Sequence, residues 1–239
     1  MIPKIIHYCW FGHGEMPQLA KDCIASWHQC MPDWEYKLWN EEAYDVNSHA
    51  YTREAYAAGK YAFVSDYVRL WALEREGGLY LDTDVLAFRS FEDLLANKAF
   101  AGFEGSKHQP IGTCVMGSEP HGEWVSTMLE AYRDRHFVNA DGTCDLTTNV
   151  QFITSLMAAH GFRQDGSEQD CLGLHVYPVD YFSPRHTTGE YIRTDHTYSE
   201  HKGLASWNDQ HKGCKYYLLR WLGPRLSVRL IKLKRKLFG

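Results

Sequence analysis

The sequence predicts an α/β protein, in which strands and helices alternate along a chain of 239 residues. Three observations carry this prediction. Short apolar runs typical of buried strands, such as residues 4–10, are followed by longer stretches of helical character, such as residues 17–29. Hydrophobic residues make up 44% of the chain, which is enough for an ordinary core. Residues 79–81 form a short apolar strand that ends beside two aspartates, and α/β folds bind ligands at such strand ends.

The remaining elements of the first half follow from local patterns. Residues 35–39 alternate as a second strand does, and residues 41–59 are expected to be helical in pieces. The next helix is expected to have Ser65 as its N-cap and to stop at the pair Gly77-Gly78, because glycine readily ends a helix.

The second half is expected to continue the alternation of strands and helices. We predict strands at 99–104, 112–116 and 174–179, helices at 121–135 and 147–160, a polar loop with short strands at 183–213, and a helix at 216–238 broken near Pro224.

The number and spacing of the cysteines indicate the cellular compartment in which the protein is expected. The seven cysteines are scattered and form no Cys-x-x-Cys pair, so a disulfide framework or a zinc cluster is not expected and a reducing, cytoplasmic compartment fits best. The opening residues resemble no signal peptide, and no apolar run is long enough to span a bilayer. Aromatic residues reach 14%, for which core filling is a better explanation than ligand stacking.

The charge is divided unevenly between a body, residues 1–214, and a tail, residues 215–239. The tail holds eight basic and no acidic side chains, whereas the body holds 17 basic and 30 acidic ones. Four tail leucines fall within a stripe of about 60° on a helix. We expect a basic amphipathic helix that attaches to an anionic membrane surface on the inner face of the cell membrane. The alternative is a helix docked on the body, and the acidic body disfavours nucleic acid.

The two aspartates after the apolar strand are the main chemical signal. Asp82 and Asp84, one residue apart, would repel each other and lose hydration if they were left unpaired. A hard divalent cation, Mn²⁺ or Mg²⁺, resolves this conflict and keeps coordination sites for substrate phosphates. An Asp-x-Asp pair alone is weak evidence, but the preceding strand and Gly77-Gly78 strengthen it.

A second charged pair precedes this motif. Asp66 and Arg69 are three residues apart and share one face of a helix that is apolar nearly all round. Two interpretations remain open for them: an internal ion pair, or side chains that bind sugar hydroxyls.

The combined pattern, Ser65-Asp66-x-x-Arg69 followed by Gly77-Gly78-x-Tyr80-x-Asp82-x-Asp84, resembles DXD-containing glycosyltransferases of the glycosyltransferase 32 type. That family includes initiating mannosyltransferases and capsule-type sugar transferases, and the clostridial glucosylating toxins have a related core. The opening residues 2–12 are similar to the family's first strand. The resemblance is good over residues 2–12 and 60–86 and looser elsewhere.

The resemblance implies roles for individual residues. Trp10 would stack on the donor base, Asp66 and Arg69 would bind hydroxyls of the donor sugar, and Asn149 would lie near that sugar. An alternative for Asn149 is a capping residue that opens the next helix.

It also implies a set of metal and diphosphate contacts. Asp82 would contact ribose or the metal, and Asp84 would ligate the metal. His201 would be a further ligand, with Ser206 and Trp207 at the donor and Trp207 closing over its diphosphate. Lys202 stands where the family usually has a second histidine.

The implied protein has a GT-A type, Rossmann-like fold and transfers a hexose with retention of configuration. Because the sequence places no carboxylate at the anomeric carbon, front-face transfer is favoured over a covalent intermediate. A UDP-hexose donor is preferred to GDP-mannose, and the acceptor is expected to be a glycan or a lipid-linked sugar in surface or capsular polysaccharide synthesis.

Two other classes of protein share parts of this pattern. Phosphohydrolases of the haloacid dehalogenase type also place Asp-x-Asp after an apolar strand, but they want threonine or valine where Leu86 stands. A sugar- or nucleotide-binding module without turnover is the other alternative, because a fold does not guarantee a function.

Overall fold

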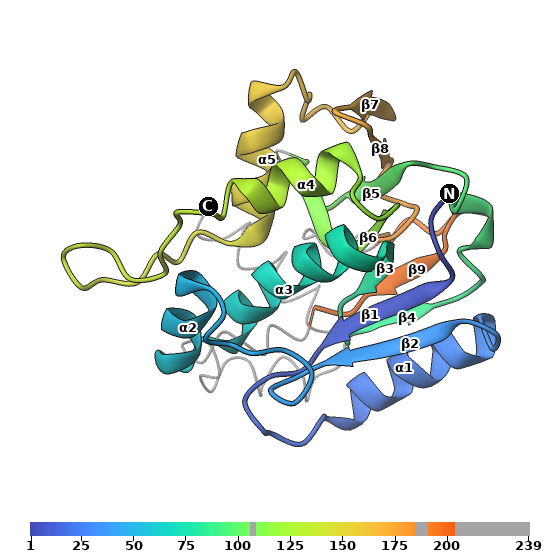
Figure 1. Ribbon diagram of the computed structural model, residues 1–239. Coiled ribbons are helices and arrows are strands. Elements are labelled where there is room, and N and C mark those ends of the chain that lie inside the picture. The colour runs from blue at the N-terminus through green and yellow to red at the C-terminus, as the bar shows by residue number, and fades with distance from the viewer. Residues whose placement is uncertain (106–108, 185–190, 204–239) are drawn as a thin grey trace, which may run out of the picture. The chain divides into compact units, whose positions relative to one another are not determined.

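The structure is a computed structural model that describes residues 1–105, 109–184 and 191–203 (Figure 1). Within these ranges the chain alternates strands and helices, and the predicted α/β class is confirmed. The predicted helix at 216–238 and the donor-site calls Ser206 and Trp207 lie outside the described residues. No helix among the described residues has the length and apolar character needed to cross a membrane.

A mixed sheet of seven strands forms the centre. Its order is β2-β1-β3-β6-β5-β8-β7. The strands are β1 (Ile5–Cys9), β2 (Glu35–Trp39), β3 (Gly78–Leu81), β5 (Ala99–Phe103), β6 (Ile111–Ser118), β7 (Gln169–Cys171) and β8 (Leu174–Tyr177). Strand β1 runs parallel to both β2 and β3, whereas β6 is antiparallel to β3 and β5. The carboxyl ends of β1 and β3 therefore open at the same edge of the sheet.

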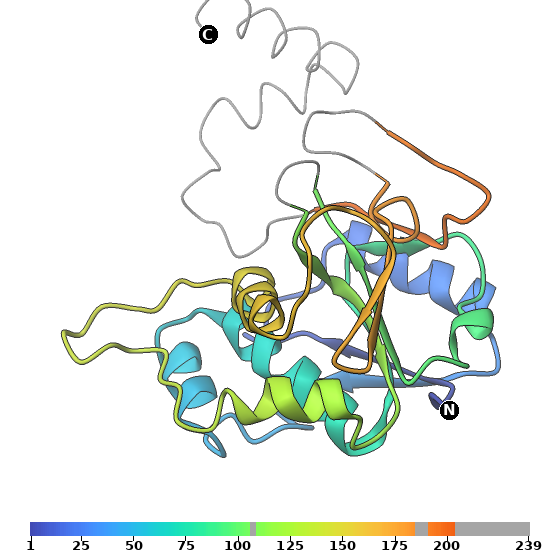
Figure 2. The same cartoon turned by 90° about the horizontal axis from the view of Figure 1, so that it is seen from above.

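Helices cover one face of the sheet more heavily than the other (Figure 2). The helices are α1 (Gln18–Cys30), α2 (Ala50–Ala57), α3 (Tyr61–Glu76), α4 (Glu123–Glu130) and α5 (Asn149–Ala159), with one short 3₁₀ turn, η1 (Glu92–Leu94). Buried side chains of α2 to α5 join one apolar cluster, and those of α1 and η1 join a second cluster. The sheet lies between these two cores, as an α/β layered fold requires.

Strand β3 contributes side chains to both apolar clusters. Leu79 and Leu81 belong to the cluster beside α1, and Tyr80 between them belongs to the cluster beside α3. Side chains alternate across a strand, so a fully buried strand must be apolar at every position. This geometry also directs the Tyr80 ring towards α3, where it meets the charged pair of that helix.

The glycine pair before β3 is required by its backbone. Gly77 and Gly78 have φ values of 63° and 102°, which side chains with a Cβ rarely adopt. A Cβ on Gly78 would lie 2.7 Å from the backbone oxygen of Ile5. The pair therefore ends α3 and lets β3 begin in close contact with β1.

A small antiparallel ladder lies beside the main sheet. It pairs β4 (Val85–Ala87) with β9 (Ser199–His201), and Val85 stands opposite His201. β9 falls within the predicted polar loop with short strands. The ladder brings His201 beside Asp84, which precedes Val85 in the chain.

Several predicted boundaries differ from the structure. Helix α3 begins at Tyr61, four residues before the predicted N-cap Ser65, whose hydroxyl instead bonds to the Tyr61 carbonyl inside the helix. The predicted helix at 121–135 is limited to α4, which ends at Glu130. Both errors concern ends of helices, where burial of the flanking chain overrides local propensity.

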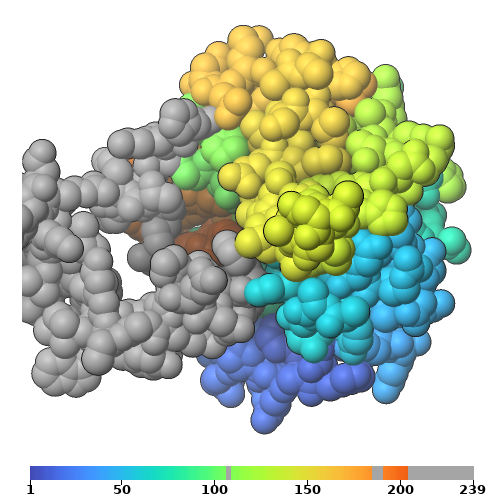
Figure 3. Space-filling model, turned by 90° about the vertical axis from the view of Figure 1, so that its left-hand side faces the viewer, coloured from blue at the N-terminus to red at the C-terminus, as the bar shows by residue number. Residues whose placement is uncertain are grey.

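The segment from 136 to 148 projects from the body between α4 and α5 (Figures 1 and 2) and stands at the front of the face in Figure 3. Glu54 of α2 accepts hydrogen bonds from the backbone N–H groups of Phe137 and Val138, at 2.9 and 3.0 Å. Arg135 forms an ion pair with Asp145 at 2.7 Å. These contacts fasten the base of the loop, while Leu146 is left exposed.

Candidate active site

The turn after β3 holds the two aspartates of the motif. The Asp82 N–H donates to the carbonyl of Cys114 in the neighbouring strand β6 at 2.9 Å, which extends the sheet contact by one residue. The Val85 N–H then donates to the Asp82 carbonyl at 2.9 Å and closes a tight turn. Asp84 is buried, and the Asp82 side chain remains one quarter exposed. The motif therefore stands at the rim of the sheet, where a ligand can reach it.

Arg69 joins this turn to helix α3. Its Nη2 lies 3.0 Å from Asp66 Oδ1 and 3.4 Å from Asp82 Oδ1. Its Nη1 donates to the Thr113 carbonyl at 2.8 Å, and the guanidinium lies over the Tyr80 ring. Asp66 and Arg69 thus form the internal ion pair, one of the two interpretations left open, and their contact with sugar hydroxyls stays a prediction. Since Arg69 also reaches Asp82, the helix pair and the Asp-x-Asp motif form one buried network.

Burial governs the charges of this network. It raises the pKa of the Asp66 carboxyl to about 6, although the Arg69 cation acts in the opposite direction. Burial lowers the pKa of Arg69, but Asp82, Tyr80 and Asp66 outweigh it and raise that pKa further above its usual range. Arg69 is therefore a fixed cation whose Nη2 contacts both the Asp66 and the Asp82 carboxylate.

His201 completes a set of three candidate metal ligands. Its Nε2 lies 3.3 Å from Asp84 Oδ1, and ligand atoms of Asp82, Asp84 and His201 all lie within 4.8 Å of one another. Burial opposes the charged imidazole, but Cys114 and Asp84 outweigh it and hold the pKa of His201 well above its usual range. The sequence comparison with the family proposed these three residues, and the structure brings them together.

Their chemistry fits a divalent cation. Two carboxylate oxygens and one imidazole nitrogen suit Mn²⁺, whereas Mg²⁺ prefers oxygen ligands alone. Three protein ligands leave further coordination positions for water and phosphate oxygens. The close approach of two carboxylates and a histidine is the observation that makes this the candidate metal centre.

Asn149 contacts the same network from helix α5. Its side-chain amide donates to the backbone carbonyl of Asp66 at 3.3 Å, and its Oδ1 accepts a hydrogen bond from the Tyr132 hydroxyl at 3.2 Å. The alternative capping role is wrong, because Thr148 is the N-cap, in a capping box with Gln151. Asn149 therefore holds the backbone of Asp66 in place through this hydrogen bond.

Trp10 lies at the same edge of the sheet, directly after β1. Its indole N–H donates to the Gly14 carbonyl at 2.5 Å, and its backbone N–H donates to the Trp39 carbonyl at 2.9 Å. Both bonds hold the half-buried ring in place. Its predicted role as a stacking platform for a base stays a prediction.

Sequence reasoning assigned no role to four residues of the site. Tyr80 donates to Asp82 Oδ1 at 2.9 Å, and Thr113 accepts from Arg69. Glu104, whose pKa is raised by burial, and Cys114 have ligand atoms close to His201. For Tyr80 the signal was available, because it is the one polar side chain in the apolar strand before the motif. The other three lie on β6 or directly after β5, and only the strand order brings them to the site.

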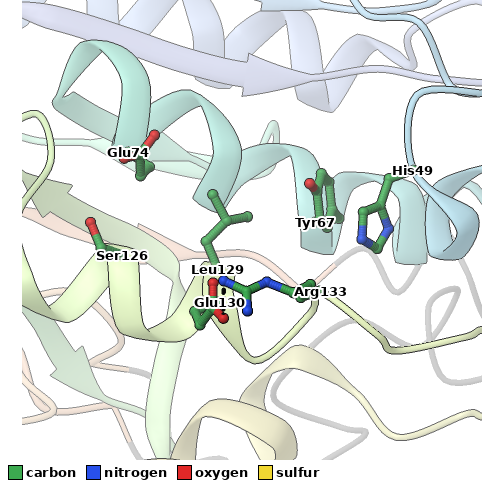
Figure 4. A pocket seen from close by; sticks show the side chains of 7 residues that line it. All are labelled: His49, Tyr67, Glu74, Ser126, Leu129, Glu130 and Arg133. Carbon is green, nitrogen blue, oxygen red and sulfur yellow. Dashed lines mark ion pairs between the residues drawn. The ribbon is translucent and has the colours of Figure 1, made fainter.

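A separate pocket lies between α3 and α4, with a volume of about 410 Å³ (Figure 4). It is lined by His49, Tyr67, Glu74, Ser126, Leu129, Glu130 and Arg133. Its polar groups have partners nearby, since Arg133 forms an ion pair with Glu130 and the Glu74 carboxylate lies 2.8 Å from His121 Nδ1. No residue of the carboxylate network lines it. We therefore place the chemistry at the network and not at this pocket.

Comparison with known proteins agrees with that choice. Residues 17–101 match the family described as "Glycosyltransferase sugar-binding region containing DXD motif". The chain is 34% identical over 226 residues to inositol phosphoceramide mannosyltransferase 3 of Schizosaccharomyces pombe, covering 91% of this chain and 59% of that protein. It is 32% identical over 139 residues to mannosyl phosphorylinositol ceramide synthase SUR1 of Saccharomyces cerevisiae, covering 56% of this chain and 35% of that protein.

A solved structure, the PaToxG glycosyltransferase, aligns with 54% of this chain and 59% of its own at a TM-score of 0.46 and 19% identity. The chain thus spans less than two thirds of the length of these relatives. The matched region contains α3, β3 and the turn after β3, with Asp66, Arg69, Asp82 and Asp84 all inside it. Residues 17–101 of the chain are thus a glycosyltransferase sugar-binding region that contains the DXD motif.

Proposed function

We propose that this chain, with a GT-A type fold, transfers a hexose from a nucleotide-sugar donor to an acceptor hydroxyl with retention of configuration. The observation that carries the proposal is the convergence of Asp82, Asp84 and His201 beside the buried Asp66–Arg69 pair. A divalent cation held by the three ligands would offset the charge of the leaving diphosphate.

The chain's own residues supply orientation. The Asp66 carboxylate, held by Arg69 and by Asn149 on its backbone, is placed to accept hydrogen bonds from sugar hydroxyls. Arg69 and the Tyr80 hydroxyl both contact Asp82 Oδ1, which leaves Oδ2 of that carboxylate for the donor or the cation. Such fixed groups lower the barrier because they need no reorganisation when charge develops.

The donor and the acceptor follow from weaker arguments. UDP-hexoses remain the first candidates, and the names of the fungal relatives add mannose to the sugars that must be screened. The same names describe a ceramide-linked acceptor, which supports a lipid-linked acceptor as well as a growing glycan in surface or capsular polysaccharide synthesis.

A donor screen tests the proposal. Purified protein with Mn²⁺ is incubated with each UDP-hexose and with GDP-mannose, and release of free nucleotide is recorded. We expect release from one donor, loss of release with a chelator, and loss of at least about a hundredfold in Asp84→Asn, since one metal ligand is removed. Asp134→Asn, an exposed aspartate after α4, is the matched control and should match the parent protein.

The possible outcomes separate the candidate functions. Metal-dependent binding of a nucleotide sugar without any release, even with a panel of lipid-linked and glycan acceptors, would favour a binding module over an enzyme. Neither binding nor release would refute the transferase proposal.

The basic tail supports a second, independent proposal about location. We propose that residues 215–239 attach the protein to the anionic inner face of the cell membrane, supported by eight basic and no acidic side chains in that segment. Co-sedimentation with anionic vesicles should fall when the tail is removed and should be weak with neutral vesicles. Equal sedimentation with both vesicle types would contradict it.

A further inference from the structure

His201 also belongs to a second group of side chains, which differ in chemistry and lie outside the Asp-x-Asp motif. Ligand atoms of Glu104, Cys114 and His201 all lie within 4.8 Å of one another. Glu104 follows β5, Cys114 is in β6 and His201 is in β9, so the fold assembles the group from three separate strands. The hexosyl-transfer chemistry proposed above needs neither the thiol nor this carboxylate.

The geometry leaves room for a cation among them. Ligand atoms around tetrahedral Zn²⁺ stand about 3.5 Å apart, so shifts of about 1 Å would close the group on the ion. Gly112 permits such movement, because a Cβ at that position would lie 3.2 Å from Glu104 Oε2. The Ser183 hydroxyl lies 3.7 Å from the Cys114 sulfur and is placed to donate to a thiolate.

The kinds of ligand select the kind of ion. Thiolate, imidazole and carboxylate together are typical of Zn²⁺ and of its substitutes Co²⁺ and Cd²⁺, whereas Mg²⁺ and Mn²⁺ favour oxygen-rich sets such as Asp82 and Asp84. When the metal–sulfur bond forms, the thiol proton passes to solvent. Cys114 forms no disulfide, so its sulfur is free to ligate.

We propose that Glu104, Cys114 and His201 form a second cation site that prefers Zn²⁺, and that it is an alternative to the Asp82–Asp84 site because both require His201. A zinc ion at the second site withdraws the imidazole from the first site. The cation of the Asp-x-Asp motif then keeps two protein ligands instead of three and binds more weakly. The binding of zinc rests on these side chains alone, and only its consequence for turnover rests on the proposed function.

Cobalt spectroscopy tests the site without any turnover. The whole protein is titrated with Co²⁺ under reducing conditions, and the sulfur-to-cobalt charge-transfer absorption is recorded. We expect the band in the parent protein, its loss in Cys114→Ser, and its displacement by Zn²⁺. Cys30→Ser and Cys144→Ser, which remove two other partly buried thiols, are the matched controls and should keep the band.

A second variant distinguishes ligation from a general effect on folding. Glu104→Gln should keep the band at saturating cobalt and weaken the affinity by at least about tenfold, because the thiolate stays and one oxygen ligand is lost. A parent protein without the band, or a band that survives in Cys114→Ser, would overturn the proposal.

Competition between the two sites is measured by electron paramagnetic resonance of free Mn²⁺. Zinc also competes with Mn²⁺ directly at the Asp-x-Asp site, because nitrogen and oxygen ligands bind Zn²⁺ more tightly than Mn²⁺. Zinc should therefore raise the apparent dissociation constant for Mn²⁺ more in the parent protein than in Cys114→Ser, where only the direct competition remains. Equal effects of zinc in both proteins would show that occupancy of the second site does not weaken the first and would overturn the proposed competition. Since neither readout uses a sugar donor, a failure of the transferase proposal leaves this test intact.

Discussion

Replacing Arg69 by methionine should be among the most destabilising single changes in the site. The Arg69 side chain is 7% exposed, and its guanidinium contacts Asp66 at 3.0 Å, Asp82 at 3.4 Å and the Thr113 carbonyl at 2.8 Å. Methionine keeps much of the apolar contact but leaves two carboxylates without their cation. Loss of one partner from a buried ion pair costs about 3–5 kcal/mol, and we expect the free energy of unfolding to fall by that amount at pH 7.

Arg89 provides a matched control for this change. It also lies over a tyrosine ring at 4.5 Å and forms an ion pair with Asp93 at 2.9 Å, but its side chain is 44% exposed. Water screens that pair, so Arg89→Met should cost less than about 1 kcal/mol. The contrast isolates burial, because the two arginines have the same kinds of partner.

A double variant tests the cause of the loss. If the uncompensated carboxylates cause it, then Asp66→Asn made in the Arg69→Met background should recover about 1 kcal/mol or more, which is a non-additive result. Unfolding in urea followed by circular dichroism measures the parent protein, Arg69→Met, Asp66→Asn, the double variant and the Arg89→Met control, provided that the slopes with denaturant agree. The reasoning is refuted if Arg69→Met loses no more stability than Arg89→Met, or if the two changes in the site simply add.

Three further changes test other parts of the structure. Burial lowers the pKa of His7 from 6.5, so the imidazole binds a proton less readily in the folded protein than in the unfolded chain. The folded state is therefore fully stable with respect to this group above pH 6.5. As the pH falls below 6.5, the free energy of unfolding should decrease by up to about 1.4 kcal/mol per pH unit. His7→Gln should remove this part of the slope in urea titrations at several pH values, and an unchanged slope would contradict it. Gly78→Ala should lower the free energy of unfolding by more than about 2 kcal/mol, because the backbone at this position has φ 102° and an added Cβ would lie 2.7 Å from the Ile5 oxygen. Gly142→Ala is the control, since it strains φ without a close contact. If the melting temperature falls no further in Gly78→Ala than in Gly142→Ala, the close contact does not matter. Thr148→Ala should cost about 1 kcal/mol by removing a helix cap, whereas Thr148→Ser should cost much less, and equal losses would show that the hydroxyl does not matter.

The parts of the fold that the sequence predicted are those in which one local pattern decides. An apolar run between a glycine pair and two aspartates has few alternatives to a buried strand, and β3 lies at residues 78–81 against the predicted 79–81. The start of α3 was wrong, because Ser65 is a good cap by type but the four residues before it are drawn into the helix by the burial of Phe63 and Val64. Local propensity carries no information on that burial.

The residues of the site also fall into those that the sequence predicted and those that depend on the fold. Spacing paired Asp66 with Arg69 and Asp82 with Asp84, and the resemblance to the family joined the two pairs in one site. Glu104 and Cys114 gave no signal, because each is an ordinary residue, one directly after β5 and the other in β6. Their relation to His201 exists only after the strand order has been set.

The position of His201 explains why the site depends on the fold more than its motif suggests. Asp82 and Asp84 are held by the central sheet, but His201 reaches them through the three-residue ladder of β4 and β9. Short strands of this kind contribute little stability by themselves. A cation that binds all three residues therefore stabilises the ladder by the same free energy that the ladder contributes to metal affinity. The stability of the β4–β9 ladder thus depends on whether the cation is bound.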